Sequence, residues 1–340
     1  MLNSFGFFLH IIDELFYNNN SRKFLYLMLG NKGGFMMPNI WTHMLFCEEV
    51  VDTINDPTPF FQHETYMKLG AQGPDPFFYY NFWPWNKDES VSAIGMALHT
   101  RNCGAFLLDL IISAADMESC VKAYVFGFVT HHVLDRNAHP YIHYRAGYTG
   151  NKHQELEILI DTVMMDKFHN MKTWKAHVHK EIDIGYSLDK DIIDLLHAKI
   201  KKHYPDVAKD SGAYIQKSYR DLKLALRLLS DPYGWKNVVL KSLISSFSHQ
   251  PIKSNVDYLN ESQTTWHHPA TNEPSSQSFL DLYQIGRAEG IEITGEVLSY
   301  WNNPTEEKVK HLESLIGNIS YDTGKPLELN LENKYSEPIV

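Results

Sequence analysis

Residues 123–143 read AYVFGFVTHHVLDRNAHPYIH, an apolar run followed by four histidines and one aspartate. On a helix, His131, Asp135 and His139 stand at positions i, i+4 and i+8, so their side chains project from one face. The apolar run before them predicts that this helix is buried, and burying these groups without partners would cost on the order of several kcal/mol. A metal ion removes that cost because it accepts a lone pair from each of the three side chains. The stretch therefore predicts a buried helix with a metal-binding face.

The next predicted helix, residues 151–170, repeats this arrangement. Its sequence NKHQELEILIDT places His153, Glu157 and Asp161 at i, i+4 and i+8. A histidine and a glutamate four residues apart on one helical face commonly supply two zinc ligands. Two such stripes on successive buried helices are a much more specific signal than either stripe alone.

Three upstream residues complete the predicted site. His43 lies in the first turn of a helix that begins at Asn39, Asp75 lies in the irregular GPDP loop, and His99 ends the apolar helical stretch MALHT. Imidazole combined with carboxylate suits zinc better than calcium or magnesium, and so many donors exceed the needs of one tetrahedral ion. We therefore expect two or three zinc ions. The predicted ligands are His43, Asp75, His99, His131, Asp135, His139, His153 and Glu157.

The rest of the chain predicts an all-α fold with a single multi-helix domain. Alternating patterns typical of strands are nearly absent, whereas a 3.6-residue apolar period recurs. The one long polar loop, residues 245–277, is of a length that often lines a site or serves as a lid. We expect an extension over residues 1–36, the domain over 37–322 and a fraying C-terminal tail over 323–340. Further helices are expected over residues 91–115, 191–204, 213–231 and 278–301.

Composition narrows the class of protein. The net charge of −10 argues against a protein that binds long nucleic acid and leaves at most peripheral contact with a membrane. The three cysteines show no pairing pattern, which favours free thiols in a reducing compartment. No apolar run is long enough to span a bilayer or is followed by a cleavage site, so we expect a cytoplasmic protein. Nothing in the sequence indicates an oligomeric state.

In their order and spacing, these motifs resemble the zinc-dependent phospholipase C family, which is related to the S1/P1 nucleases. That family shows a histidine on the N-terminal helix, a loop aspartate, a helix histidine, an H-x3-D helix followed by a histidine, and the motif H-x3-E-x3-D-T. The resemblance covers roughly residues 37–165, and its last motif, HQELEILIDT, is the most specific. Residues 170–340 match only in being helical. The resemblance implies an all-α fold of the phospholipase C and P1 nuclease type, with a zinc cluster in a cleft.

The resemblance also implies roles for individual residues. His99, His131 and Asp135 would hold the first ion, and Asp135 would bridge to a second ion held by His43. A third ion would be held by His139, His153 and Glu157. Asp75 would act as general base or as a further ligand, a metal-bridged hydroxide would attack phosphorus, and Asp161 would orient a ligand imidazole. The implied substrate is a small phosphodiester or a phospholipid.

The chain departs from the family in two places. The histidine after the aspartate comes slightly later in the secreted phospholipases, which leaves open whether His139 or His143 is the ligand. Those enzymes also use their N-terminal amine as a ligand, which residues 1–36 would prevent. Because the codons of Lys-Gly-Gly can contain a ribosome-binding sequence, we expect translation to start at Met37 and Pro38 to supply a free amine beside His43. The alternative is a genuine disordered tail over residues 1–36, with His43 binding the metal unaided.

Two other functions compete with a phospholipase C. A nuclease or nucleotidase on the same scaffold would cleave a phosphodiester with the same metal cluster. A non-catalytic protein could use the zinc cluster for structure alone, and only an open coordination position distinguishes that case. The head group or nucleotide that the protein recognises cannot be derived from this sequence.

Overall fold

Helix α8 (Ser119–Ala146) runs through the middle of the structure and is buried along almost its whole length. The structure, a computed structural model, describes residues 40–54, 57, 60, 62–83, 86, 88–233 and 248–340. The expected extension 1–36, the start at Met37, the ligand Pro38 and the N-cap Asn39 lie outside the described residues.

The described part of the chain is all-α, as the apolar periodicity predicted. Its one small sheet is an antiparallel hairpin of two-residue strands, β1 (Trp266–His267) and β2 (Pro274–Ser275). Short 3-10 turns are η1 (Asp75–Tyr79), η2 (Thr173–Lys175), η3 (Val178–Lys180) and η5 (Leu327–Leu329). The other helices are α3 (Ile40–Val51), α5 (Glu64–Gly70), α6 (Ser92–Thr100), α7 (Cys103–Ala114), α9 (Lys152–His169), α10 (Lys190–His203), α11 (Ala213–Leu229), α13 (Phe279–Asn302) and α14 (Glu306–Ile316).

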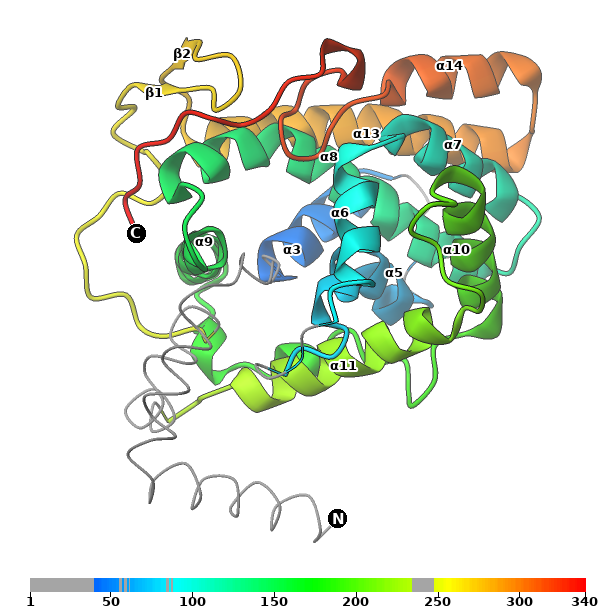
Figure 1. Ribbon diagram of the computed structural model, residues 1–340, viewed down its shortest axis with the longest axis horizontal. Helices are drawn as coiled ribbons and strands as arrows, with labels where there is room; N and C mark the ends of the chain where they lie inside the picture. Colours follow the sequence, from blue (N-terminus) through cyan, green and yellow to red (C-terminus); the bar gives the residue numbers. More distant parts are fainter. Residues whose placement is uncertain are drawn as a thin grey trace, which may run out of the picture.

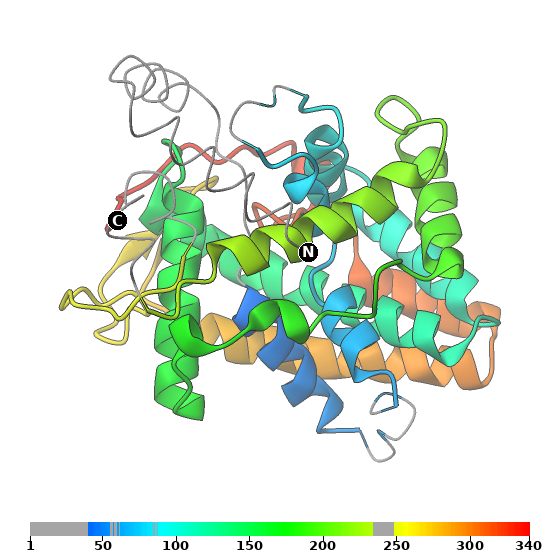
Figure 2. The same cartoon turned by 90° about the horizontal axis from the view of Figure 1, so that it is seen from below.

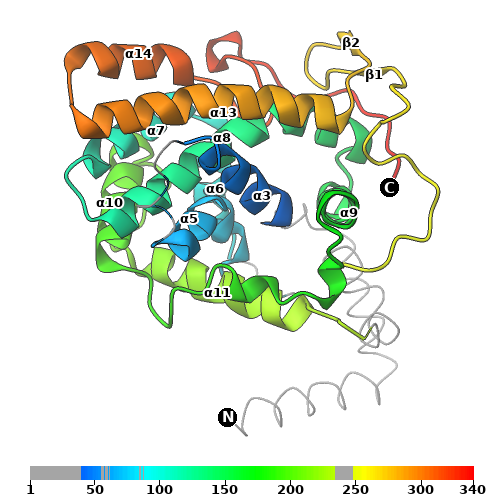
Figure 3. The same ribbon diagram turned by 180° about the vertical axis from the view of Figure 1, so that it is seen from behind.

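The longer helices surround a set of shorter helices at the centre of the structure. In Figure 1, α8 and α13 run along one side, α11 runs along the opposite side, and α3, α5 and α6 lie between them. Helix α9 is seen end-on in Figures 1 and 3 but lengthwise in Figure 2, so it stands crosswise to the long helices. This arrangement directs side chains from α3, α6, α8 and α9 toward a common centre.

Helices α5 and α8 touch backbone to backbone. A Cβ atom added at Gly70 would lie 1.9 Å from the carbonyl oxygen of Tyr124, and one added at Gly127 would lie 2.1 Å from that of Met67. Only glycine permits so close an approach. The contact holds the segment after α5 against α8, directly beside His131.

One predicted helix is divided in two. We expected a single helix over residues 91–115, but α6 ends at Thr100 and α7 begins at Cys103. Arg101 is extended, with φ −142° and ψ 139°, and Asn102 is left-handed at φ 48°. Asparagine tolerates the left-handed region better than most residues, so it accommodates the turn.

The C-terminal segment, where we expected a fraying tail over residues 323–340, makes backbone hydrogen bonds to the rest of the structure. Lys334 donates its backbone N–H to Pro269, Glu337 donates to Tyr144, and Ile339 donates to Arg145, all at 2.8 Å. The bonds to Tyr144 and Arg145 satisfy carbonyl groups at the end of α8 that have no helical partner. The part of the expected 245–277 loop that the structure describes contains the β1–β2 hairpin, which packs against the same helix end.

Among the described residues, no helix combines the length and the apolar character that spanning a bilayer requires.

Candidate metal centre

The face of α8 that bears His131, Asp135 and His139 points into the centre of the molecule. Asp135 is 2% exposed, and its Oδ2 atom lies 2.9 Å from Nε2 of His131. Its Oδ1 atom lies 3.2 Å from Nε2 of His139 and 3.2 Å from Nε2 of His43. Asp135 is therefore the shared carboxylate of the centre. Burial alone would raise its pKa, but His131, His139 and His43 hold that pKa well below its usual range.

Two of the histidines are oriented by backbone carbonyl groups. The Nδ1 atom of His99 lies 2.8 Å from the carbonyl oxygen of Gly95, and Nδ1 of His131 lies 3.1 Å from that of Ala71. A carbonyl oxygen only accepts, so each Nδ1 carries the proton and a neutral ring keeps its lone pair on Nε2. Such an outer hydrogen bond is typical of metal-binding histidines. His99 and His131, with Asp135, form a group whose donor atoms lie within 4.8 Å of one another.

A turn before η1 brings Asp75 to this group. Gly73 has φ +50°, and a Cβ atom there would lie 2.3 Å from Cδ2 of His131, so a side chain would collide with the ring. Pro74 follows, and Asp75 opens η1. Its Oδ1 atom lies 3.2 Å from Nε2 of His99, and its Oδ2 atom lies 3.9 Å from Nε2 of His131. The loop residue predicted from the GPDP motif thus lies inside the cluster.

His43 projects from the first turn of α3, and Asp161 fixes that turn. The ring of His43 stacks on that of His131 with centroids 4.3 Å apart. Asp161 accepts hydrogen bonds from the backbone N–H of Trp41 at 3.1 Å and from that of Thr42 at 2.8 Å. Burial raises the pKa of Asp161 to about 7, against the lowering effect of Thr42 and Trp41. These bonds reach the helix that carries His43, whereas our sequence analysis expected Asp161 to orient an imidazole.

Helix α9 supplies a third group. Nε2 of His153 lies 3.2 Å from Oε1 of Glu157, and Nε2 of His139 lies 3.6 Å from the same oxygen. Burial would raise the pKa of Glu157, but His153 and His139 lower it to about 2. Burial would lower the pKa of His139, but Asp135, Asp322 and Glu157 raise it well above its usual value. The donor atoms of His139, His153 and Glu157 lie within 4.8 Å of one another, and the ring of His143 also lies beside that of His153, with centroids 4.6 Å apart.

One residue at this centre was missed by our sequence analysis. Asp322 lies after α14, and its Oδ1 atom is 3.8 Å from Nδ1 of His139 and 3.8 Å from Nε2 of His143. His143, which our sequence analysis left open as an alternative ligand to His139, thus faces a carboxylate, whereas His132 is buried beside Arg136. A single aspartate in a turn offers no periodic pattern, so the sequence held no signal for Asp322.

Three donor atoms of the centre lack ordinary hydrogen-bond partners. Within the part of the chain that the structure describes, Nε2 of His99, Nε2 of His131 and Oδ2 of Asp135 are buried without one. Buried polar atoms are nearly always satisfied, and leaving them unpaired is costly. Three oriented lone pairs converging on one space are what a zinc ion requires, so these residues fit a zinc cluster.

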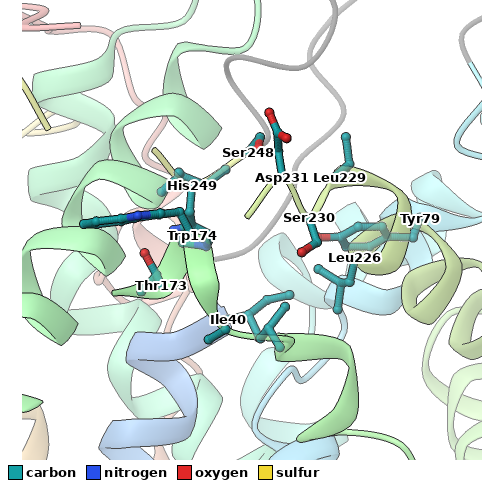
Figure 4. Close-up of a pocket in the computed structure, with 13 residues that line it drawn as sticks. Ile40, Tyr79, Thr173, Trp174, Leu226, Leu229, Ser230, Asp231, Ser248 and His249 are labelled. Carbon is teal, nitrogen blue, oxygen red and sulfur yellow. The ribbon is translucent and has the colours of Figure 1, made fainter. Parts of the chain in front are cut away.

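Two cavities adjoin the centre. The larger, of about 460 Å³, is bordered by His143 and Asp322 together with the segment after α14. The smaller, of about 40 Å³, lies between Trp174 and His249 on one side and Tyr79 on the other (Figure 4). Nδ1 of His249 shares a hydrogen bond of 3.0 Å with the hydroxyl of Thr162, and burial lowers the pKa of His249 to about 4. Of these two cavities, only the larger is lined by members of a donor group.

Comparison with known proteins gives one match. The sequence model described as "Zinc dependent phospholipase C" matches residues 42–214, just over half of the 340 residues. The match includes each of the eight predicted ligands and ends at the start of α11. Neither a curated protein nor a solved structure matches the chain. Because the match spans the buried histidine and carboxylate groups described above, this chain belongs to the zinc-dependent phospholipase C family.

Proposed function

We propose that this protein is a zinc-dependent phosphodiester hydrolase that acts on a small phosphodiester or a phospholipid. The observation that supports the proposal most strongly is the position of Asp135, which lies within 3.7 Å of four imidazole nitrogens, those of His43, His99, His131 and His139. A carboxylate surrounded in this way is suited to bridge two cations, and multi-metal sites are typical of enzymes that cleave phosphate esters.

The proposed ligand sets follow the three donor groups. His99, His131 and Asp135 would hold one ion, and His139, His153 and Glu157 would hold another. His43 would hold a further ion with Asp135, in the space that it shares with Asp75 and His131. Two or three zinc ions are therefore proposed. When bound, they would neutralise the phosphate oxygens and lower the pKa of an attacking water.

Asp75 is proposed as the general base or as a further ligand. It is the only one of the proposed ligands in a 3-10 turn, and its carboxylate faces both His99 and His131. In the base role it would accept the proton of the attacking water, while His99 and His131 would hold the ion beside it. Its 5% exposure keeps competing solvent away from the carboxylate.

The larger cavity supports a small substrate. Its volume of about 460 Å³ lies in the range of about 300–1,000 Å³ that is usual for small-molecule sites. Asp322 and Glu332 contribute acidic groups to its wall, and the described residues that line it include no lysine or arginine. A long nucleic acid would be repelled by this wall and by the net charge of −10, whereas a short phosphoester or a lipid head group would fit.

The competing functions differ from the proposed one either in substrate or in access to the metal centre. A nucleotidase on this scaffold would use the same ligands, so only the substrate distinguishes it. A purely structural zinc cluster would be closed, whereas the cavity beside His143 and Asp322 leaves an approach from solvent. Peripheral contact with a membrane would be sufficient for a phospholipid substrate. A cytoplasmic location remains a prediction from the three cysteines, all of which are free thiols in the structure.

The experiment is a substrate panel with a matched pair of variants. Zinc-loaded protein would be assayed on a phosphocholine ester, a bis-aryl phosphate and a cyclic or short nucleotide. Asp75→Asn should lower turnover by about 10²–10⁴-fold with its zinc content intact if Asp75 is the base. Loss of zinc from Asp75→Asn would make it a ligand instead. Asp116→Asn, which removes an exposed carboxylate, is the control. Absence of hydrolysis across the whole panel would overturn the proposed function.

A further inference from the structure

A fourth group of donor atoms lies beside the cluster and shares only His139 with the ligand set proposed above. It consists of Nδ1 of His139, Nε2 of His143 and an oxygen of Asp322, all within 4.8 Å of one another. The side chains are 6%, 14% and 18% exposed, respectively. Asp322 lies far beyond residue 214, where the family match ends, so the match does not account for this group.

The three atoms resemble the donor atoms of His99, His131 and Asp135, which are also buried without a hydrogen-bond partner. Nδ1 of His139, Nε2 of His143 and Oδ1 of Asp322 are all buried without a hydrogen-bond partner among the described residues. The two 3.8 Å separations are too long for hydrogen bonds. They fall within the 2.9–3.9 Å range of the histidine–aspartate pairs around Asp75 and Asp135. Ligands at about 2.0–2.2 Å from a zinc ion are separated by about 3–4 Å.

Backbone contacts of its neighbours Tyr321 and Gly324 hold Asp322 close to α8. Pro140 lacks an N–H, so the carbonyl oxygen of Arg136 loses its helical donor. Gly324, at φ +60°, packs on that carbonyl so closely that a Cβ atom would lie 2.2 Å from its oxygen. Tyr321 donates its backbone N–H to His99 at 3.0 Å. Residues on either side of Asp322 are thus fixed to α6 and α8, two of the helices that carry the cluster.

The group is also accessible. His143 and Asp322 both line the cavity of about 460 Å³, so water can reach an ion held there and complete its coordination. The mixture of imidazole and carboxylate favours zinc or a similar divalent transition metal over magnesium or calcium.

We propose that His143, Asp322 and Nδ1 of His139 form an additional divalent-metal position next to the zinc cluster. His139 then faces two positions, with Nε2 toward Glu157 and Nδ1 toward Asp322. A neutral imidazole has one lone pair, so filling both positions releases the ring proton to solvent. This position therefore binds metal more weakly than the cluster and exchanges it more readily. The proposal concerns metal binding alone and does not depend on the reaction catalysed.

The test is metal binding by the full chain, with zinc or cobalt as the probe. Equilibrium dialysis and native mass spectrometry of the wild type should show one more ion at high free metal than at low free metal. Asp322→Asn and His143→Gln should each weaken binding of this last ion by at least about 100-fold. Loss of a residue that only orients a ligand weakens metal binding by up to about 100-fold, so a larger effect indicates a direct ligand. The matched controls are Glu328→Gln, in the segment after α14 that also carries Asp322, and His169→Gln, at the end of α9. Both residues are exposed.

His153→Gln separates this position from the cluster. It should remove a different ion, so the double variant with Asp322→Asn should lose two. The proposal is overturned if the wild type shows no additional binding step, an outcome that needs no variant to fold. It is also overturned if Asp322→Asn and His153→Gln lose the same ion, because Asp322 would then only position His139.

Discussion

Thr42 donates both its backbone N–H, at 2.8 Å, and its hydroxyl, at 2.7 Å, to Oδ1 of Asp161, although the two residues are 119 positions apart. The carboxylate also accepts the N–H of Trp41, so a side chain on α9 accepts hydrogen bonds from two backbone N–H groups in the first turn of α3. The first N–H groups of a helix have no partner within it, and a carboxylate is the acceptor that the helix dipole favours. His43 follows Thr42 directly, so this contact fixes the entry of α3 into the metal centre.

Replacing Asp161 should therefore loosen α3. Asp161→Ala removes the acceptor of two buried N–H groups and one hydroxyl, and should lower the free energy of unfolding by about 2–3 kcal/mol. Asp161→Asn keeps one acceptor oxygen and should cost less. Denaturant unfolding of the metal-loaded protein measures both. Equal stability of Asp161→Ala and the wild type would show that the contact does not hold the helix.

Gly73 should not tolerate a side chain. In Gly73→Ala the new Cβ atom would meet the ring of His131, so either the ring or the Asp75 turn must move. We expect weaker zinc binding and a loss of stability of about 2 kcal/mol or more, since backbone strain adds to the collision. Gly150→Ala is the matched control, because Gly150 also has a positive φ, at +58°, but nothing lies within 4 Å of the new atom. Similar losses in both variants would contradict a specific role of the His131 contact.

The three thiols should differ in reactivity. Burial raises the pKa of Cys47 and of Cys103 to about 12 each, so neither forms a thiolate near neutral pH. Cys120 is partly exposed. A thiol reagent at pH 8 should therefore modify one cysteine in the native protein and three after unfolding, and peptide mapping should place the first at Cys120. Rapid modification of Cys47 or Cys103 in the folded protein would contradict the described packing.

Asp109 should make stability depend on pH through its contacts between α7 and α10. It accepts hydrogen bonds from Lys199 at 2.9 Å, Lys202 at 2.7 Å and His203 at 2.9 Å. Burial would raise the pKa of Asp109, but these three groups lower it to about 2 from the ordinary 3.8. A carboxyl group whose pKa is lowered by folding stabilises the fold fully at pH values above its ordinary pKa. This stabilisation is lost as the pH falls toward the pKa in the folded protein.

Asp109→Asn should accordingly lower the free energy of unfolding by about 1–2 kcal/mol near neutral pH, allowing for partial exposure. The difference from the wild type should narrow below pH 4. Urea titrations at pH 7, 5, 4 and 3 measure it, with Asp116→Asn as the exposed control. A difference that stays constant over this range would rule out an electrostatic origin.

The sequence was sufficient for those parts of the site that lie on single helices. His131 and Asp135 on α8, and His153 and Glu157 on α9, are placed by the pitch of the helix alone. The centre could not be completed in this way, because Asp322 depends on how α14 and the following turn pack against α8. The break at Asn102 was missed for a related reason: apolar spacing continues across it, and a single left-handed residue leaves no periodic trace. The C-terminal segment has a polar composition typical of a tail, yet its backbone pairs with carbonyl groups that only the fold exposes.

The central claim is that the buried histidines and carboxylates hold a zinc cluster, and the zinc content of the purified full chain tests it most directly. After loading and gel filtration, we expect two to three zinc equivalents per chain by elemental analysis. Chelation should remove them and lower the temperature of unfolding, because the donor atoms would be left buried and unpaired. A chain that retains no zinc, and whose unfolding temperature is the same with zinc and with chelator, would contradict the account.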